Sequence, residues 1–100
     1  MGLFSGNKMY SIDELTVLEA VVLKAALKDL NDAKAREALE HMRNFQLSKA
    51  DIKMIIPLMK VHYTNLKMLL LHDLDEKDAK EVESQAEACV SCAAKLKQMI

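Results

Sequence analysis

The sequence predicts an all-α fold: a four-helix bundle-like domain built on a long antiparallel hairpin of its third and fourth helices. The 100 residues include only two Gly and one Pro, so few positions suit the tight turns of a sheet. Four helix-start signals divide the chain, and the two longest segments after them carry apolar residues in a seven-residue repeat. We expect one helical domain over residues 11–100, preceded by a flexible N-terminal arm over residues 1–10.

Each helix-start signal is a residue whose side chain can cap a helix, directly preceded by an apolar residue that packs on the first turn. Ser11 forms a complete capping box with Glu14, and the other expected caps are Asn31, Ser48 and Asp75. The helices that follow these caps are expected to span about 12–29, 32–44, 49–72 and 76–100.

The first predicted helix, over 12–29, is apolar on most of its surface. Two neighbouring apolar stripes run along it, and Val17 and Val21 extend the apolar character further round. Such a helix is normally buried in its own fold or in an oligomer. The second, over 32–44, has one narrow apolar edge, so we expect it to cover the core from outside. Because no Gly lies between the two, their junction is either a tight corner or a kink in one longer helix.

The third and fourth predicted helices carry apolar seams that match each other. The connection over 73–75 is short, which implies an antiparallel hairpin. Pro57 lacks an N–H donor inside the third helix and is expected to kink it. The seam of the third helix is Ile52, Ile56, Met59, Tyr63, Leu66 and Leu70, and that of the fourth is Ala79, Val82, Ala86, Cys89, Ala93, Leu96 and Ile100.

A second apolar face lies on the third helix, opposite its main seam. This face either packs on the first two helices or forms an interface with a partner, and methionine suits adaptable contact surfaces. The first and third helices together carry more apolar surface than a 100-residue monomer readily hides. We therefore predict a homo-oligomer. The residues assigned to its interface are Met54, Leu58, Val61, Met68, Val17 and Val21.

Two cysteines invite a metal or redox interpretation. Cys89 and Cys92 lie one turn apart on the fourth helix, and the hairpin brings His62 to their level. Thiolates and an imidazole can share a soft cation, although a closed zinc site needs four ligands. The other interpretation is that Cys89 is a small core residue in an alanine-rich seam and that Cys92 flanks it. His41 would join the group only if the second helix packs alongside.

A row of lysines follows one flank of the third helix. Lys49, Lys53, Lys60 and Lys67 form either a track for phosphate or an acidic partner, or a solvated flank. Few aromatic residues interleave with them, and the net charge of the chain is −1. We therefore expect no binding to nucleic acid or to anionic membranes.

The chain carries no recognisable catalytic constellation. It has three His, no Gly-rich phosphate loop and no metalloprotease motif. We predict a small non-enzymatic protein-interaction or regulatory module without a cofactor, whose partner is another protein or a second copy of itself. A metal or redox sensor built on Cys89, Cys92 and His62 is the alternative. Two helical cysteines do not form a secreted disulfide framework, and no apolar run is long enough to span a membrane, so we expect a cytoplasmic protein.

Overall fold

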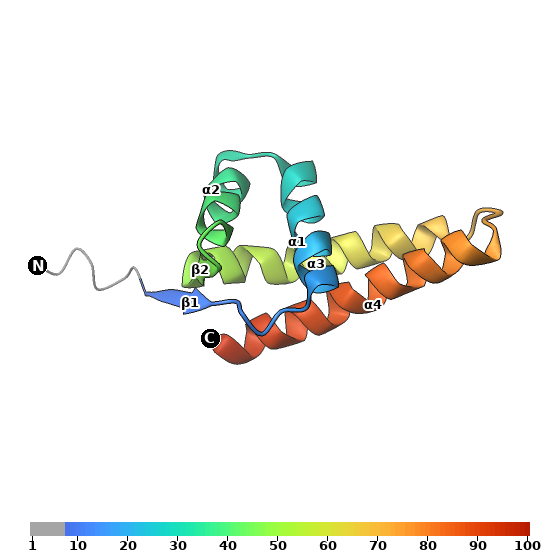
Figure 1. Cartoon of the computed structure of the whole chain (residues 1–100). Helices are drawn as coiled ribbons and strands as arrows, with labels where there is room; N and C mark the ends of the chain where they lie inside the picture. Colours follow the sequence, from blue (N-terminus) through green and yellow to red (C-terminus); the bar gives the residue numbers. More distant parts are fainter. Residues whose placement is uncertain (1–7) are drawn as a thin grey trace, which may run out of the picture.

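In the computed structural model, which describes residues 8–100, two long helices lie side by side and two shorter helices stand across one end of them (Figure 1). The all-α class and the helical hairpin that the sequence predicts are confirmed. A small two-stranded antiparallel ribbon joins the helices. In chain order the elements are β1 (Met9–Ser11), α1 (Val17–Leu30), α2 (Ala33–Met42), β2 (Gln46–Ser48), α3 (Lys49–Leu69) and α4 (Glu76–Met99).

The hairpin of α3 and α4 is the frame of the molecule. The residues that the seven-residue repeats predict for its seam are buried or half-buried, except Ile100, which is exposed beyond the end of α4. α3 ends at Leu69, earlier than expected, and remains one uninterrupted helix through Pro57. The buried seam residues are Ile52, Met59 and Leu66 on α3 and Ala86, Cys89 and Leu96 on α4.

Two of the four predicted caps are confirmed. The Ser48 hydroxyl accepts from the Asp51 backbone N–H (3.0 Å), and the Asp51 carboxylate accepts from the Ser48 N–H (2.9 Å), so α3 begins with a capping box. The Asp75 carboxylate accepts from the Asp78 N–H (2.8 Å) at the start of α4. Both caps satisfy N–H groups that have no partner within the helix.

The predicted cap at Ser11 is wrong, and α1 begins five residues later than the expected start at residue 12. Ser11 ends strand β1, which pairs with β2, and the Ile12 N–H donates to the Phe45 carbonyl (2.9 Å). Strand pairing thus takes the backbone groups that a helix start would use. Thr16 caps α1 instead, in a capping box with Glu19. Residues 9 and 10, which the sequence placed in the flexible arm, belong to the ribbon, and residues 1–7 of that arm lie outside the described residues.

The junction of α1 and α2 is a tight corner, and the predicted cap at Asn31 is also wrong. Asn31 adopts a left-handed conformation (φ 48°) and ends α1, its N–H donating to the Leu27 carbonyl (3.0 Å). Asn tolerates this conformation better than most residues. Asp32 caps α2 by accepting from the Ala35 N–H (2.8 Å). Of two adjacent polar residues, Asn31 therefore ends α1 and Asp32 begins α2.

The hairpin extends well past α1 and α2, and the described chain measures 57 × 25 × 20 Å. α1 packs on α4, α2 and α3, and the most deeply buried residues, among them Leu23, Leu27 and Ile55, lie where these helices meet. The far part of the hairpin stands clear of the shorter helices in Figure 1. Within residues 8–100, no helix is both long and apolar enough to cross a membrane.

Candidate docking surfaces

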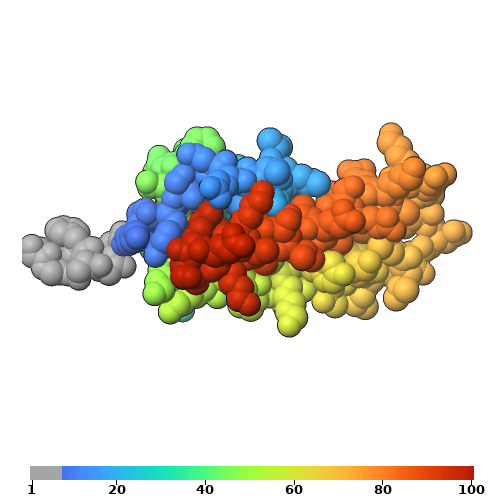
Figure 2. Space-filling model, turned by 90° about the horizontal axis from the view of Figure 1, so that it is seen from below, coloured from blue at the N-terminus to red at the C-terminus, as the bar shows by residue number. Residues whose placement is uncertain are grey.

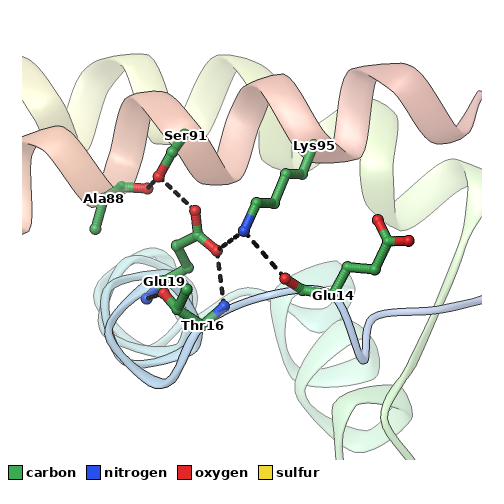
Figure 3. Close-up of polar contacts among 6 residues, drawn as sticks. All are labelled: Glu14, Thr16, Glu19, Ala88, Ser91 and Lys95. Carbon is green, nitrogen blue, oxygen red and sulfur yellow. Dashed lines mark hydrogen bonds and ion pairs between the residues drawn. The ribbon is translucent and has the colours of Figure 1, made fainter.

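A buried carboxylate fastens the start of α1 to α4 (Figure 3). Glu19 is only 2% exposed. Its Oε1 accepts from Lys95 Nζ (2.7 Å) and from the Thr16 N–H (2.7 Å), and its Oε2 accepts from the Ser91 hydroxyl. Lys95 Nζ also donates to the Glu14 carbonyl (3.0 Å). Each oxygen of the buried carboxylate therefore has at least one donor, which a buried charge requires.

The electrostatics of this cluster favour the charged form of Glu19. Burial by itself raises the pKa of the carboxyl group. The hydrogen bonds from Lys95, Ser91 and Thr16, together with the positive charge of Lys95, outweigh burial and lower the pKa from 4.5 to about 2. The hydrogen-bonding needs of the Glu19 carboxylate are thus met within the cluster. We interpret the cluster as a buried ion pair that attaches α1 to α4.

This anchor determines which side of the hairpin is covered. α1 lies against the α4 side that carries Ala88, Ser91 and Lys95. A second contact between charged groups, from His41 Nδ1 to Asp51 Oδ2 (2.6 Å), fastens α2 to the first turn of α3. Both short helices are therefore held on the same side of the hairpin, and no helix within residues 8–100 covers the opposite side.

On that opposite side, α3 and α4 form the walls of an apolar hollow of about 400 Å³, which we call the open groove. Figure 2 shows this region from below: α4 (orange to red) lies between the blue N-terminal segment and α3 (yellow), and the border between α4 and α3 is crossed by no other element on this face. The open groove is lined by Ile56, Met59, Lys60, Tyr63, Cys89, Val90, Ala93, Ala94 and Lys97.

The charge of the open groove is wholly basic. Lys60 stands on its α3 wall and Lys97 on its α4 wall, and no acidic residue lines it. Within residues 8–100, neither lysine has an acidic partner within 4 Å. The groove therefore presents apolar walls with an unpaired positive charge on each side.

A second candidate surface runs along α3 on the side facing away from α4. We call it the outer stripe and define it by Pro57, Val61, Thr64 and Met68, which step along α3 by four, three and four residues, together with Leu71 in the turn that follows α3. Val61 is 56%, Met68 57% and Leu71 84% exposed. This spacing is that of a coiled-coil seam, here without a partner helix in the described chain.

The residues predicted for the interface separate into two groups. Met54 and Leu58 are half-buried and pack against the core, so part of their surface is already used within the chain. Val61 and Met68 remain exposed on α3. Val17 and Val21 remain exposed on α1, on the side away from its buried residues.

The predicted metal group does not form a cluster. Among residues 8–100, no three His, Cys, Asp or Glu side chains lie close enough together to hold a metal ion. Burial raises the pKa of the Cys89 thiol to about 11, and burial with the nearby Glu19 charge raises that of Cys92 to about 12. Burial therefore disfavours the thiolate forms that metal binding and redox chemistry use. His41, the further ligand considered for this group, contacts Asp51 instead.

Sequence reasoning missed the Glu19 anchor and the open groove. The anchor had a signal: Thr16 and Glu19 have the spacing of a capping box and follow the apolar Leu15, as Ser11 and Glu14 follow Tyr10. The sequence signal for the groove was weak. Val90 and Ala94 directly follow the seam residues Cys89 and Ala93, so they resemble the edge of the seam and not a separate surface.

Comparison with known proteins adds no assignment to these surfaces. No protein-family model, no curated protein and no solved structure matches the chain.

Proposed function

We propose that this chain is a non-enzymatic helical protein-interaction module that associates with a second copy of itself through the outer stripe of α3. The observation that supports this proposal most directly is the exposure of Val61 and Met68, seven residues apart on α3, followed by the exposed Leu71 in the next turn. A lone exposed apolar residue is unremarkable in a folded protein. A row of them at coiled-coil spacing matches what a partner helix covers.

The free energy available at this surface comes from burying the apolar side chains. Burial of apolar surface contributes about 25 cal/mol per Å². Val61, Met68 and Leu71 each expose more than half of their surface in the single chain. In a two-fold dimer each of these residues is contributed by both chains, which doubles the apolar area that association buries.

The lysine row next to the stripe favours one orientation of the pair. Lys53, Lys60 and Lys67 all lie on the same flank, and the other flank carries the uncharged Asn65. If the two α3 helices run parallel, each lysine row faces the uncharged flank of the partner. If they run antiparallel, the two lysine rows face each other and repel. We therefore propose a parallel pair.

Two valines of equal exposure provide a matched test. Val61 of the outer stripe and Val90 of the open groove are each 56% exposed, and each stands on a long helix. We expect Val61→Glu to weaken self-association at least about tenfold, because each dimer would have to bury two glutamates. We expect Val90→Glu to leave it unchanged. Light scattering and sedimentation over a range of protein concentrations measure both.

The proposal has clear contrary outcomes. A wild-type chain that stays monomeric at all concentrations would contradict self-association. A Val61→Glu variant that keeps the size of the wild type would place the interface elsewhere. Circular dichroism on each variant verifies that the helices are retained.

A further inference from the structure

The open groove has the shape of a site for one more helix. Its α3 wall runs from Ile56 to Tyr63 and its α4 wall from Cys89 to Lys97, which is about two helical turns on each side. Buried Met59 and Cys89 form part of its lining. On the other side of the hairpin, α1 and α2 already occupy the equivalent position. A helix placed in the groove would give the hairpin a covering layer on both sides.

The walls of the groove differ in the size of their side chains. The α4 wall is built from small residues, Val90, Ala93 and Ala94, which allow another helix to come close. The α3 wall contributes Ile56 and Tyr63, which are larger and half-buried. The large apolar side chains that fill the hollow must therefore come from the occupant.

The charges define the occupant further. Lys60 and Lys97 stand on opposite walls without an acidic partner in residues 8–100. A helix between them meets positive charge on both of its flanks. Acidic residues on both flanks of its apolar face would pair with these lysines, whereas basic residues would be repelled.

A second copy of this chain does not offer such a helix within the described residues. Its exposed apolar residues on α1, such as Val21, are followed one and two turns later by Lys24 and Lys28. Those of α3 are flanked by the lysine row. The acidic part of α4, with Glu83 and Glu87, has a single large exposed apolar residue on its face, Val90, which itself lines the groove. Within residues 8–100, no exposed helix face combines several large apolar residues with acidic residues on both flanks, as the groove requires.

We infer that the open groove is a docking site for an amphipathic helix of another protein, with large apolar residues on one face and acidic residues on both flanks of that face. This site is separate from the outer stripe and does not depend on self-association. The two surfaces have no residue in common, although Lys60 of the groove also belongs to the lysine row beside the stripe, so both can be occupied in one molecule.

A pair of synthetic helical peptides tests the inference on the full chain. Both peptides have about five turns, with Leu at the positions of one face, and they differ only in carrying Glu or Lys on the flanks. Fluorescence anisotropy measures the affinity of each peptide. We expect the Glu peptide to bind, the Lys peptide to bind at least about tenfold more weakly, and the difference to shrink at high salt.

Reversing the charge of the groove sharpens this test. The double variant Lys60→Glu/Lys97→Glu is expected to reverse the preference, so that the Lys peptide binds better than the Glu peptide. Val90→Glu is expected to abolish binding of the Glu peptide while leaving self-association unchanged. Val61→Glu is the matched control and should bind the Glu peptide as the wild type does.

Three results would overturn the inference. The first is equal binding, or no binding, of the two peptides to the wild type. The second is an unchanged preference in the double charge-reversal variant. The third is a wild-type dimer that Val90→Glu dissociates, because the groove would then hold a second copy. Circular dichroism of each variant excludes loss of folding as the cause.

Discussion

Glu19 joins two tasks that proteins usually give to different residues. Its carboxylate completes the capping box of α1 with Thr16, and the same carboxylate receives Lys95 and Ser91 from α4. The start of the helix and its attachment to the hairpin therefore depend on a single charged group. Because that group is buried, its charge is stable only while all of its donors are in place.

The low pKa of Glu19 predicts acid sensitivity. The carboxyl group titrates near its ordinary value of 4.5 in the unfolded chain and at about 2 in the folded protein. A lowered pKa in the folded state contributes stability above the unfolded value, and this is lost as the pH falls from about 5 towards 2. The full contribution is about 3 kcal/mol of unfolding free energy. Denaturant unfolding followed by circular dichroism at several pH values measures it.

The variant Glu19→Gln separates this group from the other acids. We expect it to be destabilised by about 1–3 kcal/mol at pH 7 and to lose less stability than the wild type on acidification. The control is Glu81→Gln, since Glu81 is exposed on α4. If the two variants had the same stability and the same pH dependence as each other, Glu19 would not be the anchor.

At the scale of elements, the helices were easier to predict than their starts. The seams of α3 and α4 could be read from the sequence because burial on one face imposes a strict spacing. The helix starts predicted at Ser11 and Asn31 were wrong because a second capping residue follows each of them: Thr16 after Ser11, and Asp32 after Asn31. Strand pairing decided the first choice, and the left-handed conformation of Asn31 decided the second.

The choice between the two possible starts of α1 has a direct test. Thr16→Ala removes the hydroxyl that accepts from the Glu19 N–H (3.1 Å), and we expect a loss of about 1 kcal/mol of unfolding free energy. Ser11→Ala removes a hydroxyl that serves no helix and should change stability by less than about 0.5 kcal/mol. Thermal or denaturant unfolding compares the two. A larger loss for Ser11→Ala would mean that the helix starts where the sequence first suggested.

At the scale of the whole molecule, the two ends of the hairpin differ in how much supports them. Towards the tip, the last buried residue is Leu66 on α3 and Ala86 on α4 within the described chain. The other end is covered by α1, α2 and the ribbon. Buried apolar contacts set the free energy needed to open a region locally, so the tip is held far less firmly than the covered end.

Hydrogen exchange followed by NMR measures this difference directly. We expect amides of α3 near Leu69 and of α4 near Ala79 to exchange through local opening. Amides near Ile55 and Cys92 should exchange only through openings that approach global unfolding, at least about a hundredfold more slowly. Equal protection along both helices would show that the hairpin opens as one unit. A denaturant series separates the two kinds of opening.

The docking surfaces were harder to predict than the fold, for a physical reason. The spacing of Val61 and Met68 marks an apolar face, but spacing alone does not say whether the chain's own helices cover it. That depends on where α1 and α2 lie, which the contact of Glu19 with the distant Ser91 and the contact of His41 with Asp51 decide. The self-association and the absence of enzymatic activity stay predictions.

The short ribbon has a topological consequence. The ribbon pairs Tyr10 with Leu47, so the chain between these two residues forms a ring that is closed by backbone hydrogen bonds. Both α1 and α2 lie within this ring, α1 fastened near its first residues and α2 near its last. The corner at Asn31 is therefore only one of two connections between these helices. Each would still be tethered to the rest of the molecule if the polypeptide were interrupted there.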